Sequence, residues 1–86
     1  MRDLVALRRY IAVDDPTAAA AVAPRIRSAV ENLLARPQRG RRGRVKGTRE
    51  LVIAGTPFIV AYTVLRGQVV EILAVIHGAQ EWPGEF

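Results

Sequence analysis

Three apolar runs separated by two tight turns restrict most strongly how the second half of this chain can fold. The runs are 51–53, 58–65 and 69–76, and they are rich in the β-branched and aromatic residues typical of strands. The stretches between them, 54–57 and 66–68, have turn compositions. Because connections this short join antiparallel neighbours, the sequence predicts a three-stranded antiparallel meander.

Both faces of this predicted sheet are apolar, because the residues at alternate positions of each run are mostly hydrophobic. Helices from the same small chain can cover one face of the sheet. We therefore expect the other face to bind a protein partner. Alternatively, the tail from 78 to 86 folds back over it. The residues that we expect such a partner to contact are Ile59, Leu73 and Val75, with Trp82 as a further aromatic anchor.

The first residues of the chain have helical spacing. Leu4, Leu7 and Ile11 recur every three or four positions, so we predict a helix over residues 2 to 12. An aspartate followed by Pro16 then ends this helix and begins the next one. Aspartate is a good N-cap, and proline suits the first turn of a helix.

A second helix is predicted from 16 to 35. Proline 24 lies inside its apolar pattern and removes one backbone hydrogen bond, so we expect a kink or a break there. Pro37 ends the helix, since a residue before proline avoids helical geometry. The two predicted helices would form an antiparallel hairpin packed on the sheet, which makes the predicted fold class α+β.

The charge of the chain is concentrated in one segment. Seven of the 13 basic residues fall between 36 and 49, and no acid occurs between Glu31 and Glu50. One interpretation is a solvated, flexible loop. The other is a docking site for phosphate or carboxylate, because guanidinium groups bind both in a bidentate manner. The candidate anion-binding residues are Arg39, Arg41, Arg42, Arg44, Lys46 and Arg49.

Length and composition set the remaining bounds. With 86 residues, the chain predicts one domain over 1–86. A domain of this size buries only about 60% of its unfolded surface, so its core is marginal. The net charge of +5 favours polyanions or acidic proteins as partners. We expect a cytoplasmic protein with no membrane contact, no metal site and no cofactor, since neither a leader nor a Cys/His cluster is present.

Three stretches in the order Gly43–Leu51, Thr56–Tyr62 and Val75–Pro83 resemble the RelE/ParE superfamily of bacterial toxins. The resemblance covers nearly the whole chain. It implies one half of a toxin–antitoxin pair, neutralised by a cognate antitoxin in a hetero-oligomer. Members usually begin with a short strand before the first helix. The helix predicted over 2–12 leaves this first strand missing here.

The superfamily contains two activities, and the residues favour one of them. RelE-like members cut messenger RNA on the ribosome, whereas ParE-like members inhibit DNA gyrase by binding. RelE-like nucleases have an arginine where this chain has Ile59. They have a basic residue near the end of the sheet where this chain has Gly78. RelE-like nucleases also carry lysines on the preceding strand, and the corresponding positions of this chain hold Glu50 and Val52. The resemblance therefore implies a ParE-type toxin that makes and breaks no bond itself.

Two alternatives remain open. A ribosome-dependent endoribonuclease would use Arg49, Glu50 and His77, with the histidine as general acid because its ordinary pKa is near 6.5. The residue types also allow Glu50 to form an ion pair with Arg49 instead, and Tyr62 to be a core residue. The third interpretation is a relic that only binds its antitoxin.

Overall fold

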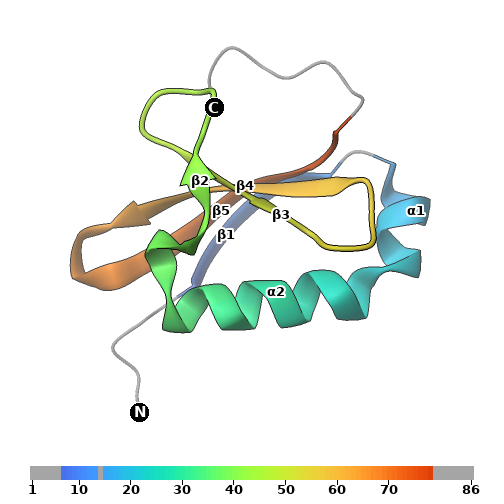
Figure 1. Cartoon of the computed structure of the whole chain (residues 1–86), viewed down its shortest axis with the longest axis horizontal. Helices are drawn as coiled ribbons and strands as arrows, with labels where there is room; N and C mark the ends of the chain where they lie inside the picture. The colour runs from blue at the N-terminus through green and yellow to red at the C-terminus, as the bar shows by residue number, and fades with distance from the viewer. Residues whose placement is uncertain (1–6, 14, 79–86) are drawn as a thin grey trace.

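A five-stranded sheet with helices on one face forms the part of the chain described by the computed structural model, residues 7–13 and 15–78 (Figure 1). The strands lie in the order β1-β5-β4-β3-β2. The pairing of β1 with β5 is parallel, and the other neighbours are antiparallel. The elements are β1 (Leu7–Val13), α1 (Pro16–Ala21), α2 (Ala23–Ala35), the 3₁₀ turn η1 (Pro37–Arg39), β2 (Arg41–Arg42), β3 (Arg49–Val52), β4 (Phe58–Leu65), η2 (Arg66–Gln68) and β5 (Val69–His77).

The predicted α+β class and the antiparallel meander are confirmed. β3, β4 and β5 follow one another through short turns and pair in that order. The bounds of β4 are those predicted, and β5 ends one residue later. The meander is correct because apolar alternation and turn composition are local signals that the tertiary structure leaves unchanged.

The helix predicted over 2 to 12 is wrong over residues 7 to 12, and the expectation of a missing first strand is wrong as well. Residues 7–13 form β1, which pairs with β5 from Leu7 opposite Val70 to Val13 opposite Val75. Residues 1–6 lie outside the described part of the chain. β1 gives the backbone groups of β5 a hydrogen-bonding partner on the side away from β4. This long-range pairing outweighs the weak helical spacing of three apolar residues.

The predicted helical hairpin is replaced by one helical segment in two pieces. The helix expected over 16 to 35 breaks at Val22, which separates α1 from α2. This break places Pro24 in the first turn of α2, where its missing N–H would have had no helical partner. Asp15 caps α1 as predicted, and its side chain accepts a hydrogen bond from the Ala18 amide at 3.2 Å. Among the described residues, no helix combines the length and apolarity needed to cross a membrane.

The main core lies between these helices and one face of the sheet. Because β4 and β5 are antiparallel, residues opposite each other point to the same face. At the centre of this face, Tyr62 lies opposite Ile72 and Val60 opposite Val75. The buried residues of this core include Ala19, Leu33, Ile53, Phe58, Val60, Tyr62, Val70, Ile72 and Val75.

A bulge in β5 changes which side chains share a face. Ala61 pairs with Ala74 but Tyr62 pairs with Ile72, so Leu73 is the extra residue. The strict alternation predicted for this strand is therefore wrong beyond Leu73. Val75 faces the helices and is only 6% exposed. The prediction that it shares a partner-binding face with Ile59 is therefore wrong.

The sheet face away from the helices is less exposed than the apolar pattern predicts. Ile59 is 9% exposed, and Ala61, Ala74 and Ile76 form a second buried cluster on this face. Leu73 is half-buried. The prediction that this face is broadly exposed is therefore wrong for the residues at its centre. Trp82 and the tail considered as a cover lie outside the described residues, apart from Gly78.

The hydroxyl of Tyr62 connects the sheet to the segment that follows α2. It donates to the Pro37 carbonyl at 2.8 Å and accepts from the Gly40 amide at 2.8 Å, while the ring is fully buried. A Cβ at position 40 would collide with this hydroxyl, so the close approach requires glycine. Burial raises the pKa of Tyr62. The predicted core role of this tyrosine is confirmed, and its hydroxyl is occupied by two backbone partners.

Replacing Tyr62 with Phe should lower the free energy of unfolding by about 1–3 kcal/mol, because one buried carbonyl and one buried amide lose their partner. Chemical denaturation measures the change. Thr63→Val is the control, since it removes an exposed hydrogen bond to the Gly47 carbonyl that water can replace. Equal stability of Tyr62→Phe and wild type would show that the two backbone groups do not depend on the hydroxyl.

Candidate functional site

The basic segment forms a hydrogen-bonded hairpin instead of an irregular loop. β2 and β3 pair antiparallel, and the turn between them is closed by the Gly43 amide, which donates to the Thr48 carbonyl at 2.7 Å. The Thr48 amide donates to the Val45 carbonyl at 3.1 Å. Gly47 has a φ of 82°, a left-handed conformation that glycine adopts without strain. The backbone positions that carry these cations are therefore defined by hydrogen bonds.

The hairpin places different charges on its two faces. Arg41 lies opposite Glu50, and Arg42 lies opposite Arg49. Arg49 also lies opposite Tyr62, so the Arg42–Arg49 pair is on the helix-side face of the sheet. Glu50 lies opposite Ala61 and is on the other face. One face of the hairpin thus carries the oppositely charged pair Arg41–Glu50, and the other face carries the like-charged pair Arg42–Arg49.

Glu50 is the centre of the first pair. Its side chain is only 3% exposed and accepts from Arg41 Nη2 at 3.0 Å, from Arg44 Nε at 3.2 Å and from the Arg44 amide at 2.8 Å. The predicted ion pair with Arg49 is wrong, because successive strand residues point to opposite faces. Burial by itself would raise the pKa of Glu50, but hydrogen bonds from Arg44 and Arg41 outweigh it and hold the pKa below its ordinary value.

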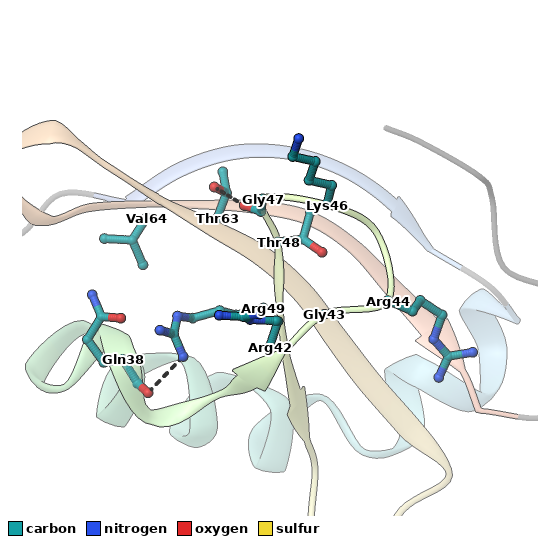
Figure 2. A pocket seen from close by; sticks show the side chains of 10 residues that line it. All are labelled: Gln38, Arg42, Gly43, Arg44, Lys46, Gly47, Thr48, Arg49, Thr63 and Val64. Carbon is teal, nitrogen blue, oxygen red and sulfur yellow. Dashed lines mark hydrogen bonds between the residues drawn. The ribbon is translucent and has the colours of Figure 1, made fainter.

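Arg49 is held by neutral groups instead. Its Nη1 donates to the carbonyls of Gln38 at 3.2 Å and Gly40 at 2.6 Å. With Arg42 it lines a hollow of about 580 Å³, which we call the cationic hollow (Figure 2). Figure 2 shows Arg44 directed away from Arg42 and Arg49. The structure thus separates Arg42 and Arg49 from Arg41, which pairs with Glu50 on the other face. The complete lining is Gln38, Arg42, Gly43, Arg44, Lys46, Gly47, Thr48, Arg49, Thr63 and Val64.

His77 lies apart from the other candidate catalytic residues. It stands opposite Phe58 at the end of β5, and the two rings meet edge to face with centroids 5.6 Å apart. Arg49 stands opposite Tyr62, four residues further along β4. At roughly 3.3 Å per residue, this separates them by about 13 Å along the strand direction. The three residues of the nuclease alternative are therefore not brought together.

Several contributors to the site were not predicted from the sequence. Gln38 and Thr48 line the cationic hollow, and the Gln38 carbonyl helps to hold Arg49. Polar residues of this kind have no sequence signal of their own. Glu50 did have one, since it is the first acid after a long basic stretch and a buried acid needs cations close by. Its partners depend on the β2–β3 register, which the sequence did not predict.

Comparison with known proteins identifies the family. The family model described as "ParE toxin of type II toxin-antitoxin system, parDE" matches residues 1–82. The chain belongs to this family. The RelE/ParE resemblance is thus confirmed, and the protein is the toxin of a type II toxin–antitoxin system. Its partner is accordingly an antitoxin.

Individual relatives agree with this assignment. A protein of Sinorhizobium fredii named "Putative toxin Y4kP" is 49% identical over 83 residues, which cover 96% of this chain and 84% of the relative. "Toxin RelE2" of Caulobacter vibrioides is 36% identical over 93% of this chain and 88% of its own length. The solved structure of a chromosomal ParDE system from P. aeruginosa has a TM-score of 0.68 at 19% identity, covering 86% of this chain and 96% of that one. This last match shows the shared fold.

Replacing Glu50 with Gln should lower the free energy of unfolding by about 1–2 kcal/mol at pH 7, because the charged hydrogen bonds to Arg41 and Arg44 are lost. The loss is no larger because both arginines are partly exposed to water. The folded-state pKa lies below the unfolded value of about 4.3. The stabilisation is therefore complete above that value and is lost as pH falls through the folded pKa.

Denaturation of both proteins between pH 7 and pH 3 measures this dependence. The difference between wild type and Glu50→Gln should shrink as the medium becomes acidic. Glu31→Gln is the control, because Glu31 is exposed on α2. A difference that stays constant over the whole range would contradict the proposed charge interaction.

Proposed function

We propose that this toxin inhibits DNA gyrase by binding, and that it acts in the cytoplasm without cleaving RNA itself. The observation that supports this proposal is the dispersal of the candidate catalytic groups over both faces of the sheet and over about 13 Å along its strands. Arg49 and Glu50 point to different faces, and His77 is at the far end of β5. A binding function does not require these groups to converge.

RNA cleavage would require an acid, a base and cations around one phosphate. Glu50 is surrounded by the Arg41 guanidinium and by the side chain and amide of Arg44, so its oxygens already have donors. Tyr62 uses its hydroxyl in two backbone hydrogen bonds. Of the three residues of the nuclease alternative, Arg49 is the only one that lines the cationic hollow.

The runner-up function is ribosome-dependent cleavage of messenger RNA. The name of the Caulobacter relative, "Toxin RelE2", is the observation that favours it. Against it stand the family model, which is described as ParE, and the separation of His77 from Arg49. An inactive relic that only binds antitoxin would show neither effect and would not inhibit growth.

The surface for the antitoxin is proposed on the sheet face away from the helices. Val52 is 52% exposed and lies opposite Ile59, so it gives this face an exposed apolar residue at β3, and Leu73 on β5 is half-buried. The antitoxin segment should be apolar there and acidic where it meets the basic hairpin. Val75 cannot share this contact directly, because it lies in the helix-side core.

His77→Gln should leave growth inhibition nearly intact, because Gln preserves hydrogen-bonding capacity and a binding toxin needs no general acid. Loss of a true general acid would cost roughly 10²–10⁴-fold in rate. Gyrase supercoiling and cleavage of ribosome-bound messages should be assayed side by side with both proteins. Message cleavage by wild type that disappears in His77→Gln would refute the proposal and establish the nuclease function.

Val52→Asp should weaken antitoxin binding at least tenfold, since it places a charge in an apolar contact that must be desolvated. The fold should tolerate the change because the side chain is already half exposed. Calorimetric titration with the product of the adjacent gene measures the affinity. Thr17→Asp, at an exposed position of α1, is the control. Equal affinities of the two variants would place the antitoxin elsewhere.

A further inference from the structure

The cationic hollow contains a charge arrangement that no carboxylate of the described residues compensates. Arg42 and Arg49 are directly opposite across the β2–β3 ladder and point to the same face. Like charges in this position destabilise a strand pair. On the other face of the same hairpin, Arg41 meets the buried acid Glu50. Among residues 7–13 and 15–78, no carboxylate forms an ion pair with Arg42 or Arg49.

Arg49 is nevertheless held in place. One nitrogen of its guanidinium donates to two backbone carbonyls, and these carry no net charge. Its remaining donors have no acceptor within the described part of the chain. Holding a cation with neutral groups fixes its direction and preserves its charge, so a bound anion would meet a group that is already oriented.

Arg42 has the complementary property. It is exposed and makes no hydrogen bond to a described residue, so its side chain is available to move onto a ligand. Both arginines line the hollow of about 580 Å³, together with the neutral side chains of Gln38 and Thr48. Such a site can present one fixed and one mobile guanidinium to the oxygens of a single anion.

We infer that the cationic hollow binds a backbone phosphate of duplex DNA, with Arg49 as the fixed and Arg42 as the mobile contact. This inference deepens the proposed function and rests on it only for the choice of DNA as the source of the phosphate. Guanidinium groups bind phosphate oxygens in a bidentate manner. A DNA contact would position the toxin on the gyrase–DNA complex without reading base sequence.

The shape of the site favours a phosphate over a carboxylate from a protein partner. The hairpin binds its own carboxylate, Glu50, in a buried setting with a backbone amide as an additional donor. The cationic hollow is open, and the exposed cations Arg39 and Lys46 lie on either side of the Arg42 strand in sequence. An open surface with several cations suits a polymer that repeats its negative charge.

Binding of a fluorescent 20-base-pair duplex to the purified toxin tests the inference by anisotropy at several salt concentrations. Arg42→Gln should weaken binding about eightfold at 0.1 M salt and reduce the slope of log K against log salt by about 0.9, as expected for one lost phosphate contact. Arg27→Gln removes the same charge from an exposed position of α2 and should change both quantities much less.

The outcomes separate the sources of the anion. Equal effects of Arg42→Gln and Arg27→Gln would overturn the inference. Binding of inorganic phosphate together with no measurable binding of the duplex at 0.1 M salt would overturn DNA as the source. If Arg42→Gln weakens binding of the antitoxin but not of the duplex, the hollow binds a carboxylate and the inference fails.

Two further measurements keep the test independent of folding and of gyrase. Arg42→Lys retains the charge but not the planar fork, so it should keep the salt slope while lowering the affinity. Supercoiling inhibition by wild type is measured separately. Selective loss of duplex binding in Arg42→Gln supports the phosphate site even if wild type does not inhibit gyrase, and that second result would refute only the proposed function.

Discussion

The arrangement of this toxin depends on the contact that Tyr62 makes with the chain after α2. A buried hydroxyl accepts from the Gly40 amide and donates to the Pro37 carbonyl, so it fixes the end of the helical segment to the central strand β4. Because buried backbone groups are costly to leave without partners, this contact stabilises the position of the segment against β4. It places β2 directly beside β3, and every charged contact of the site follows from this register.

The consequence for function is a hairpin with two chemically different faces. One face satisfies its charges internally, since Glu50 is buried against Arg41 and Arg44. The other presents Arg42 and Arg49 together, and the described residues provide no acid for them. Alternation along a strand means that a shift of one residue would exchange these sets. A small toxin can in this way hold its hairpin rigid and still offer cations to a partner.

The bulge at Leu73 has a comparable effect on the apolar surface. It moves Val75 into the helix-side core and leaves Ile59, Ala61, Ala74 and Ile76 on the opposite face. The strand itself was predictable from its apolar run, but one unpaired residue reversed the faces beyond it. The same limit applies to β1. Its residues have weak helical spacing, and pairing with β5 determined their conformation.

The sequence by itself determined the meander, the helical segment from 16 to 35, the Asp15 cap and the concentration of cations, because these arise from local composition and periodicity. It also carried the family resemblance. Only the tertiary structure decided that 7–13 is a strand, that Glu50 pairs with Arg41 and Arg44, and that Arg49 joins Arg42 instead. These features depend on register between distant segments, and register is an energy of packing and hydrogen bonding that no local pattern contains.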